Sequence, residues 1–397
     1  MGLQEPTRLL IVDQAVTFGG SLVVMANIAN NLHSDFQCSV IYEVPDTVGN
    51  YLFEDRIKKH RIHNILNYRT VEKLSEKINL VKIKYIKLFF LKLLALGKHL
   101  VRILQVIKIL KIIITDKIDI IHSNNSHEAI IAAKILHRPV VLHLHGLSAN
   151  HVKDPIRNDV NTYVAISRCV ANQAAEKSYD IDKTVTLPNP IVINKVNLAQ
   201  KKYYMDKFLI NDSDKVIGMV GRIIDWKGQL EFLDAVQIVS SKMKNVRILI
   251  IGDGSDTNDK YMKQVESKIS KLGLQDKVLI TGYIEDVNNI MASLDLLVHC
   301  STSVEPFGLV ITEAMSLGIP VIVSNLGAPA EIVKNKETGY IVDPHDAEKM
   351  SNYIITLLNN EKLAKTIGQK AKQDVLSNYC ITNYIDNLTK EYKKLLL

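Results

Sequence analysis

Cysteine is scarce in this chain of 397 residues, and its four cysteines show no pair at the spacing of a metal site or a short disulfide loop. They are Cys38, Cys169, Cys300 and Cys380. A reducing compartment is the simplest setting for such thiols. The first eight residues hold no apolar signal core, and no run reaches the roughly 20 apolar residues that a membrane span needs. We therefore expect a cytoplasmic protein.

Metal-ligand spacing is also missing from the sequence. No cluster of His, Cys, Asp or Glu has the spacing of a metal site, and we expect Asp180 and Asp182, in a polar loop after a helix, to be solvated acids. The glycines at 252 and 254, like the pair at 19 and 20, fall short of a dinucleotide-binding fingerprint. We expect no metal and no cofactor, and a nicotinamide oxidoreductase is a poor candidate.

Acidic residues are missing from the 39 positions 77–115, which carry nine lysines and arginines. This charge exceeds the net +7 of the whole chain, so the remainder is slightly acidic. Aromatic and aliphatic residues separate the cations, a composition that favours a helical insertion lying on an anionic membrane surface. The alternative is a helical hairpin packed on the core with a solvated basic face. A nucleic-acid partner is disfavoured because exposed stacking residues do not accompany the cations.

Outside this insertion, apolar strand-length runs alternate with helical segments, which predicts parallel sheets covered by helices. With 47% hydrophobic residues, the chain is long enough for two substantial cores. In the N-terminal half we expect strands at 9–13, 38–44, 119–123, 140–145 and 163–166, and helices at 21–32 and 127–136. In the C-terminal half we expect strands at 216–220, 246–251, 278–281 and 296–300, and helices at 229–243, 259–272 and 305–318.

The prolines at 188 and 190 end the first pattern and mark the connection between the halves. We therefore expect an N-terminal domain at 1–190, which contains the insertion 77–115, and a second domain at 191–375. The tail from residue 347 is expected to be helical, with its last helix at 376–397.

The segment from Glu305 to Pro320 predicts an anion-binding helix start. Gly308 breaks the preceding chain, and Gly318 followed by proline ends the helix. The free backbone N–H groups of Gly308, Leu309 and Val310 then point out of the N-terminus with the positive end of the helix dipole, an arrangement suited to phosphate oxygens.

Two glutamates flank this helix start. Glu305 lies just before it and Glu313 lies about one and a half turns inside the helix, and acids beside a phosphate site are useful as acceptors from hydroxyl groups. Upstream, Gly221 to Gly228 follow a buried strand and include two cations, Arg222 and Lys227, suited to neutralising a diphosphate that gains charge as a bond to it breaks.

Together these segments resemble the family 4 retaining glycosyltransferases of the GT-B fold. The resemblance rests on two acids separated by seven residues, and on a Gly-Arg pair with Lys-Gly five residues on, in the expected order. It implies an α/β fold of two Rossmann-like, doubly wound domains facing across a cleft, with the last helix crossing back to the N-terminal domain. It also implies a UDP- or GDP-linked sugar as donor and retention of the anomeric configuration.

The resemblance assigns roles to residues at the carboxyl ends of the expected strands, where open α/β sheets bind ligands. The residues that it implies for catalysis are His145, Arg222, Lys227 and Glu305. Those that it implies for donor binding are Gly19, Gly20, Gly221, Tyr283, Ile284, Phe307, Gly308, Leu309, Val310 and Glu313. His145 matches the family histidine that contacts the transferred sugar, and we expect its neighbour His143 to be structural.

The function expected from these features is transfer of a sugar to a lipid-linked or glycan acceptor, in bacterial surface polysaccharide synthesis at the inner face of the cytoplasmic membrane. Two alternatives remain open at this point. A sugar-nucleotide epimerase of the same fold would interconvert free donor, and a non-catalytic membrane-bound partner subunit would bind without turnover. A binding scaffold has no need of Arg222, Lys227 and both glutamates together, which disfavours the second alternative.

Overall fold

The computed structural model describes residues 5–14, 19–62, 68–79, 84–124, 126–146, 154–193, 195–254 and 259–397. The chain folds into two compact α/β units. Unit 1 is formed by residues 1–166, 170–188 and 381–397, and unit 2 by residues 167–169 and 189–380. Each is described by itself.

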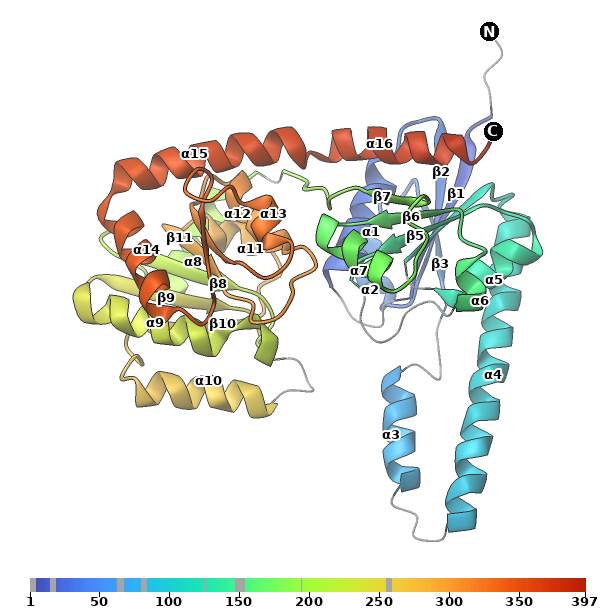
Figure 1. The fold of residues 1–397 in the computed structure, drawn as a ribbon, viewed down its shortest axis with the longest axis horizontal. Helices are drawn as coiled ribbons and strands as arrows, with labels where there is room; N and C mark the ends of the chain where they lie inside the picture. Colours follow the sequence, from blue (N-terminus) through green and yellow to red (C-terminus); the bar gives the residue numbers. More distant parts are fainter. Residues whose placement is uncertain are drawn as a thin grey trace. The chain divides into compact units, whose positions relative to one another are not determined.

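Unit 1 is built on a seven-stranded sheet in which every recorded pairing is parallel. The strand order is β3-β2-β1-β4-β5-β6-β7. The strands are β1 (Thr7–Asp13), β2 (Phe36–Tyr42), β3 (Lys58–Arg61), β4 (Ile120–Asn124), β5 (Val140–Leu144), β6 (Thr162–Ala165) and β7 (Thr184–Thr186). Residues 9–12 of β1 are at most 1% exposed, because helices cover both faces of the sheet (Figure 1).

The helices of unit 1 connect these strands and include the end of the chain. They are α1 (Gly20–Asn31), α2 (Asp46–Leu52), α3 (Tyr68–Asn79), α4 (Lys84–Thr115), α5 (His127–Ile135), α6 (Asp154–Arg157), α7 (Arg168–Glu176) and α16 (Ile381–Lys394). The last of them, α16, packs against α1. This confirms that the final helix returns to the N-terminal half.

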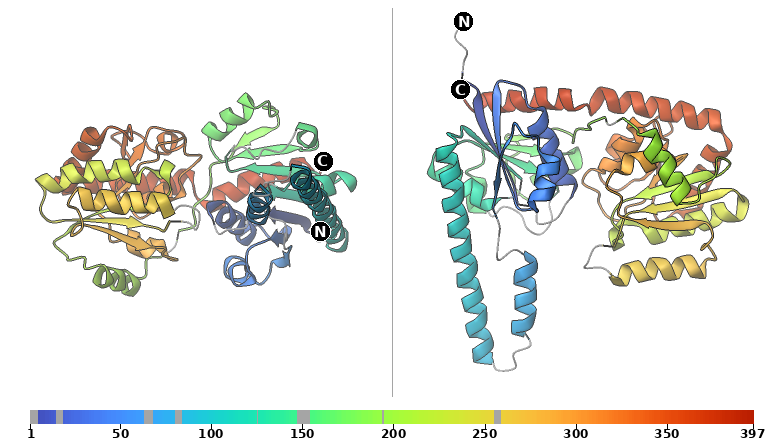
Figure 2. Two further views of the ribbon diagram at one scale, coloured as in Figure 1. Left: turned by 90° about the horizontal axis from the view of Figure 1, so that it is seen from below. Right: turned by 180° about the vertical axis from the view of Figure 1, so that it is seen from behind.

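The basic insertion 77–115 covers the end of α3 and all of α4, and these two helices pack together as a helical hairpin. Residues 80–83 between them lie outside the described residues. The C-terminal part of α4 packs on α5, and Gln105, Ile109 and Ile113 share one buried face at helical spacing. The N-terminal part of α4 runs away from the sheet beside α3 (Figures 1 and 2). At 32 residues, α4 is about 48 Å long, so only part of it lies over the core.

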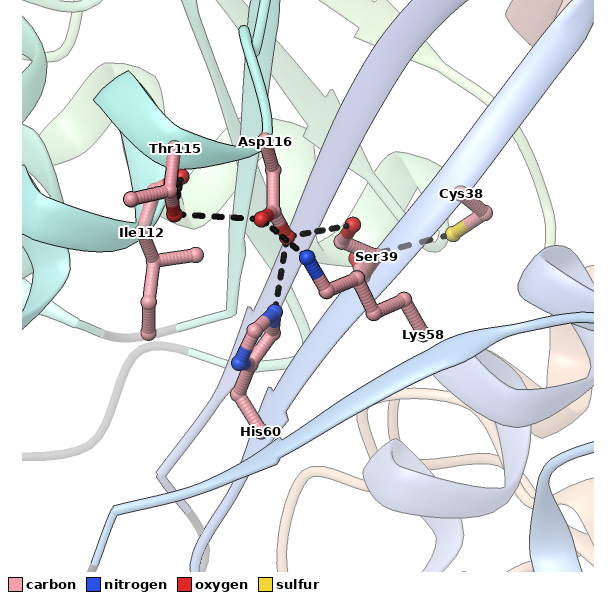
Figure 3. A network of polar contacts seen from close by, with 7 residues as sticks. All are labelled: Cys38, Ser39, Lys58, His60, Ile112, Thr115 and Asp116. Carbon is pink, nitrogen blue, oxygen red and sulfur yellow. Dashed lines mark hydrogen bonds and ion pairs between the residues drawn. The ribbon is translucent and has the colours of Figure 1, made fainter.

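Asp116, directly after α4, fastens the long helix to the sheet (Figure 3). Its carboxylate accepts hydrogen bonds from Lys58 Nζ, from His60 Nε2 at 2.7 Å and from Ser39 Oγ at 3.1 Å, all on β2 and β3. Burial alone would raise the pKa of Asp116, but these donors outweigh it and hold the pKa below its usual range. The charge on Asp116 is therefore retained near neutral pH.

Unit 2 contains a six-stranded sheet whose strand pairings are also parallel, in the order β10-β9-β8-β11-β12-β13. Its strands are β8 (Lys215–Val220), β9 (Val246–Ile251), β10 (Val278–Gly282), β11 (Leu296–His299), β12 (Val321–Ser324) and β13 (Tyr340–Val342). Its helices are α8 (Leu198–Lys207), the short 3-10 helix η1 (Asp225–Lys227), α9 (Gln229–Lys242), α10 (Asp259–Lys271), α11 (Val287–Met291), α12 (Leu309–Ser316), α13 (Pro329–Ile332), α14 (Ala347–Asn359) and α15 (Glu361–Asn378). Both units are thus doubly wound α/β domains, as expected.

The strands that sequence reasoning missed are short or polar. Residues 58–61 read Lys-Lys-His-Arg, yet they pair with β2 as the edge strand β3. An edge strand lacks a second neighbour and does not need an apolar run. Within the described part of the chain, no helix is both long and apolar enough to cross a bilayer.

Candidate functional site

In unit 2, the chain segments after β8, β10 and β11 carry the predicted donor-site residues. Because all strands of this sheet run in parallel, these segments leave the sheet at one edge. The segment after β8 enters η1, and the segment after β11 leads to Glu305 and α12. The backbone N–H of Thr302 donates to the carbonyl of Trp226 at 2.9 Å, so the two segments are joined directly.

Glu305 is the centre of a buried polar cluster. Its Oε2 atom accepts from Lys227 Nζ at 2.6 Å and from Ser301 Oγ at 2.8 Å, and lies 3.1 Å from His299 Nε2. The other oxygen, Oε1, takes part in none of these bonds. The side chains of Glu305 and Lys227 are 8% and 17% exposed, so this ion pair is largely removed from water. Glu305 therefore fixes the position of the Lys227 ammonium group.

The electrostatics of the cluster keep Glu305 ionised. Burial by itself would raise the pKa of this carboxyl group, but the hydrogen bond with His299 and the charge of Lys227 outweigh burial and hold the pKa well below its usual range. The Lys227 ammonium also lies 4.3 Å from the centre of the Trp226 ring, a cation–π contact. The cation is consequently held from two sides.

Backbone bonds also fix Glu305 from the loop after β12. Its N–H donates to the Leu326 carbonyl at 3.2 Å, and its carbonyl accepts from Ala328 N–H at 2.9 Å. Next to Lys227 in the chain, Gly228 has φ of +80°, and a Cβ there would lie 1.9 Å from the Cys300 carbonyl oxygen. Only glycine permits this approach, which holds Lys227 close to the end of β11.

The predicted helix start is confirmed. Gly308 is the N-cap of α12 with φ of +91°, no side chain caps the helix, and the helix ends before Gly318 at φ of +79°. Because the N-cap is a glycine, no capping side chain occupies the first backbone N–H groups of α12 among the described residues, so those of Leu309 and Val310 remain suited to an anion. Phe307 is buried against Tyr379, 6.1 Å between ring centres, so it supports this turn from the core side.

The remaining predicted residues of unit 2 differ in exposure. Arg222 is exposed and makes no ion pair with any residue that the structure describes, while its backbone carbonyl accepts from Gln229. Gly221 has φ of +149° directly after β8. Tyr283 is exposed and Ile284 half-buried after β10. Glu313 is half-buried within α12, and burial raises its pKa to about 7.

Sequence reasoning missed two members of the cluster, His299 and Ser301. His299 ends the apolar strand β11 and is 4% exposed, and Ser301 is fully buried. The available signal is a polar residue at the carboxyl end of an apolar strand, the same signal that marks His143 and His145 at the end of β5. Glu305 is expected from the sequence to accept hydrogen bonds from hydroxyl groups of a ligand. In the structure its Oε2 atom accepts hydrogen bonds from protein side chains, which leaves hydroxyl binding to Oε1.

In unit 1, the predicted residues lie after β1 and β5. Gly19 is the N-cap of α1 in an extended conformation, and Gly20 is the first residue of that helix. His145 follows β5, and its ring stacks on that of His143 with 4.3 Å between ring centres. Burial lowers the pKa of His145 to about 3, so its ring is neutral at physiological pH. In the described ranges, no group of three His, Cys, Asp or Glu residues is arranged to hold a metal ion.

Comparison with known proteins shows which family the chain resembles. Residues 18–195 match the family model described as Glycosyltransferase Family 4, and residues 200–374 match that described as Glycosyl transferases group 1. The chain is 26% identical over 330 residues to a UDP-Gal:alpha-D-GlcNAc-diphosphoundecaprenol alpha-1,3-galactosyltransferase of Escherichia coli, covering 77% of this chain and 84% of the relative. It is 32% identical over 200 residues, half of each chain, to the capsular polysaccharide biosynthesis glycosyltransferase CapM of Staphylococcus aureus.

Among solved structures, HepE of Anabaena in complex with UDP and glucose superimposes with a TM-score of 0.76 at 21% identity, covering 98% of this chain and 99% of the other. At this identity the similarity establishes the fold.

Glu313 gives the first prediction. Its carboxyl group ionises near pH 4.5 in the unfolded chain and at about 7 in the folded one, so its burial lowers the free energy of unfolding as pH rises from about 4.5 to 7. The shift corresponds to about 3 kcal/mol at most, and we expect about 2 kcal/mol because the side chain is partly solvated. Glu313→Gln should remove this loss, as measured by urea unfolding at about pH 5 and pH 8.

The matched control is Glu266→Gln, which alters an exposed glutamate on α10 in the same unit. In this control, the free energy of unfolding should change between the two pH values by the same amount as in the wild type. If the free energy of unfolding changed by the same amount between the two pH values in the wild type and in Glu313→Gln, Glu313 would not be the group that titrates.

Proposed function

This chain belongs to glycosyltransferase family 4, and we propose that it transfers a sugar from a nucleotide-sugar donor to a glycan or lipid-linked acceptor, with retention of the anomeric configuration. The proposed setting is the synthesis of bacterial surface polysaccharide. The observation that carries the proposal is the Lys227 ammonium fixed by buried Glu305 beside the start of α12. A fixed cation next to free helix N–H groups is suited to a diphosphate and gives a neutral ligand no comparable advantage.

Each site residue contributes a different interaction with the nucleotide-sugar donor. Lys227 and the N–H groups of Leu309 and Val310 stabilise the diphosphate, and the exposed Arg222 adds a second cation. Glu313 accepts hydrogen bonds from the donor's hydroxyl groups when ionised, and the segment with Tyr283 and Ile284 lies against the base. His145 contacts the transferred sugar, as the family resemblance implies. The donor is UDP- or GDP-linked, and the name of the E. coli relative makes uridine donors the first to test.

The bond changes in the proposed reaction require little covalent participation by the protein. The bond from the anomeric carbon to the diphosphate oxygen breaks, and the acceptor oxygen bonds to that carbon from the face that the diphosphate leaves. The acceptor proton passes to a phosphate oxygen. The diphosphate gains negative charge in this step, so fixed positive charge accelerates it. No protein nucleophile is needed, in keeping with the engagement of Glu305 by Lys227.

We further propose that the α3–α4 hairpin lies on an anionic membrane where a lipid-linked acceptor resides. Among the described side chains of α4, many large apolar ones are exposed, including Leu88, Phe89, Phe90, Leu93, Leu96, Leu100, Ile103, Leu104, Ile107 and Ile114. Such a surface is costly in water and acceptable in an interface between lipid and water. A groove of about 460 Å³ beside it is lined by Ile103, Val106, Ile107, Leu110 and Ile131, among others, and is almost wholly apolar.

Loss of the fixed cation should abolish transfer without loss of the fold. We expect Lys227→Ala and Glu305→Ala each to lower turnover by on the order of 10² to 10³, because one removes the charge and the other removes its anchor. Sugar transfer is measured with the donor that most raises the melting temperature in a screen of UDP- and GDP-sugars. A ligand at 100 times its Kd should add about 2.7 kcal/mol to the free energy of unfolding.

Lys242→Ala, at an exposed position at the end of α9, serves as the control and should retain full activity. Wild-type turnover in either folded site variant would refute the assignment. Interconversion of the free donor without transfer to any acceptor would instead identify a sugar-nucleotide epimerase.

Transfer should also persist in a chelator. Lys227, Arg222 and the α12 start supply the positive charge that a divalent ion provides in other transferases, and no metal-binding cluster is found in the described ranges. Initial rates with and without EDTA should agree within about twofold, against the losses of 10² or more that removal of an essential metal brings. Loss of activity in EDTA that returns with added magnesium or manganese would contradict this mechanism.

Membrane association is tested by flotation with vesicles containing anionic phosphatidylglycerol. Each lysine near such a surface contributes about 1 kcal/mol, so reversing four of them should release the protein at low salt. The variant replaces the lysines of α4 by glutamate at positions 92, 98, 108 and 111. The control makes the same charge change in unit 2, at lysines 242, 244, 362 and 370, and should still float. Failure of the wild-type protein to float with these vesicles would refute the membrane proposal.

A further inference from the structure

Three buried side chains of unit 1 form a hydrogen-bonded row that leads to His145. His122 lies on β4 and His143 on the neighbouring strand β5, and both are 0% exposed. His122 Nε2 lies 3.1 Å from His143 Nδ1, and His122 Nδ1 lies 2.5 Å from the hydroxyl oxygen of Tyr392. Tyr392 belongs to α16 and is also fully buried. The row thus begins in the last helix of the chain.

The charge state of the row follows from its burial. Removal from water lowers the pKa of His122 to about 3 and that of His143 well below its ordinary value. Both rings are therefore neutral at physiological pH, and each carries one hydrogen on one of its two nitrogens. The bonds between the three side chains then decide which nitrogen that is.

The Tyr392 hydroxyl decides which side chain donates in each hydrogen bond of the row. His122 Nδ1 is its recorded hydrogen-bond partner among the described residues. If the bonds ran the other way, the Tyr392 hydrogen would be buried without an acceptor and His143 Nε2 would be buried without a donor, each at a cost of about 1–3 kcal/mol. With Tyr392 as the donor, the hydrogen on His143 Nε2 is the one polar group of the row left unsatisfied among the described residues. When Tyr392 donates to His122 Nδ1, the hydrogen of His122 must sit on Nε2 and is donated to His143 Nδ1. His143 then carries its hydrogen on Nε2.

His143 is in direct contact with His145. The two rings stack at an angle of 26° with 4.3 Å between their centres, so one face of His145 rests on His143. The Nε2 atoms of both rings are buried and have no hydrogen-bond partner among the described residues. Stacking on His143 is therefore a principal restraint on the orientation of the His145 ring. If the His143 ring turned over, the His145 ring would be held less firmly.

We propose that Tyr392, His122 and His143 are positioning residues: a one-directional hydrogen-bond chain that fixes the tautomer of His143 and, through ring stacking, the orientation of His145. The role of His145 toward the transferred sugar rests on the proposed function, whereas the hydrogen-bond chain itself does not. This gives α16 a part in the active site in addition to its packing on α1.

The test removes one hydroxyl oxygen. In Tyr392→Phe, the ring keeps its place beside Phe36, 5.7 Å away between ring centres, while His122 loses its donor. In protein labelled with ¹⁵N-histidine, two-dimensional proton–nitrogen spectra should show His143 as a single Nε2–H tautomer in the wild type and as a mixture in the variant. We expect turnover to fall about 10- to 100-fold with the donor KM nearly unchanged, because ring misplacement affects the reacting geometry more than donor binding.

Tyr384→Phe is the matched control. Tyr384 lies on the same helix and is also buried, but its hydroxyl has no hydrogen-bond partner among the described residues. Its removal should leave the His143 signals and turnover unchanged. His122→Asn is the second variant: its amide oxygen still accepts from Tyr392 but no longer reaches His143, so it should reproduce the effects of Tyr392→Phe even if that variant folds poorly.

The outcomes separate the inference from the proposed function. An unchanged His143 tautomer in both Tyr392→Phe and His122→Asn would overturn the hydrogen-bond chain whatever the enzyme's substrates are. A changed tautomer with unchanged turnover, or equal losses in Tyr384→Phe, would overturn the positioning role. If no donor and acceptor supported transfer at all, the proposed function would fail, and the spectra would still decide on the chain.

Discussion

The ion pair between Glu305 and Lys227 is the interaction on which the loops at the carboxyl edge of the unit 2 sheet depend. Removing one partner from a buried pair costs on the order of 3 kcal/mol, since the other charge is left without compensation. Around this pair, backbone bonds join the segments after β8, β11 and β12, and Gly228 allows the closest approach. The arrangement places a cation and a helix start together before any ligand arrives. A diphosphate would thus meet charges that need little rearrangement, which is the main electrostatic advantage an enzyme has over water.

The sequence predicted most of the fold because both sheets are parallel and buried on both faces. Their central strands are continuous apolar runs, such as residues 9–12 and 248–251, and glycines mark the turns at 221, 308 and 318. The edge strand β3 could not be found this way, since four polar residues carry no hydrophobic signal. Its place depends on pairing with β2 and on the Asp116 bonds, which are properties of the folded chain.

The site was predicted less completely than the fold. Arg222, Lys227, Glu305 and the α12 start follow from loops after apolar strands and from the family resemblance. The partners that fix them do not, because His299 and Ser301 belong to no spacing pattern and become relevant only when β11 ends beside Glu305. His143, expected to be structural, is indeed buried, but its bond to His122 joins residues 21 positions apart in the sequence. Such a contact depends on strand order.

The return of α16 to unit 1 has a consequence for synthesis of the protein on the ribosome. Residues 381–397 complete unit 1 but are translated after all of unit 2. Domains generally fold as they emerge, and here the second unit is finished while the first still lacks the helix that covers Phe36 and His122. Apolar surface of the first unit is therefore open to chaperones or to neighbouring nascent chains during that interval. Slow translation of residues 381–397 would prolong this exposure.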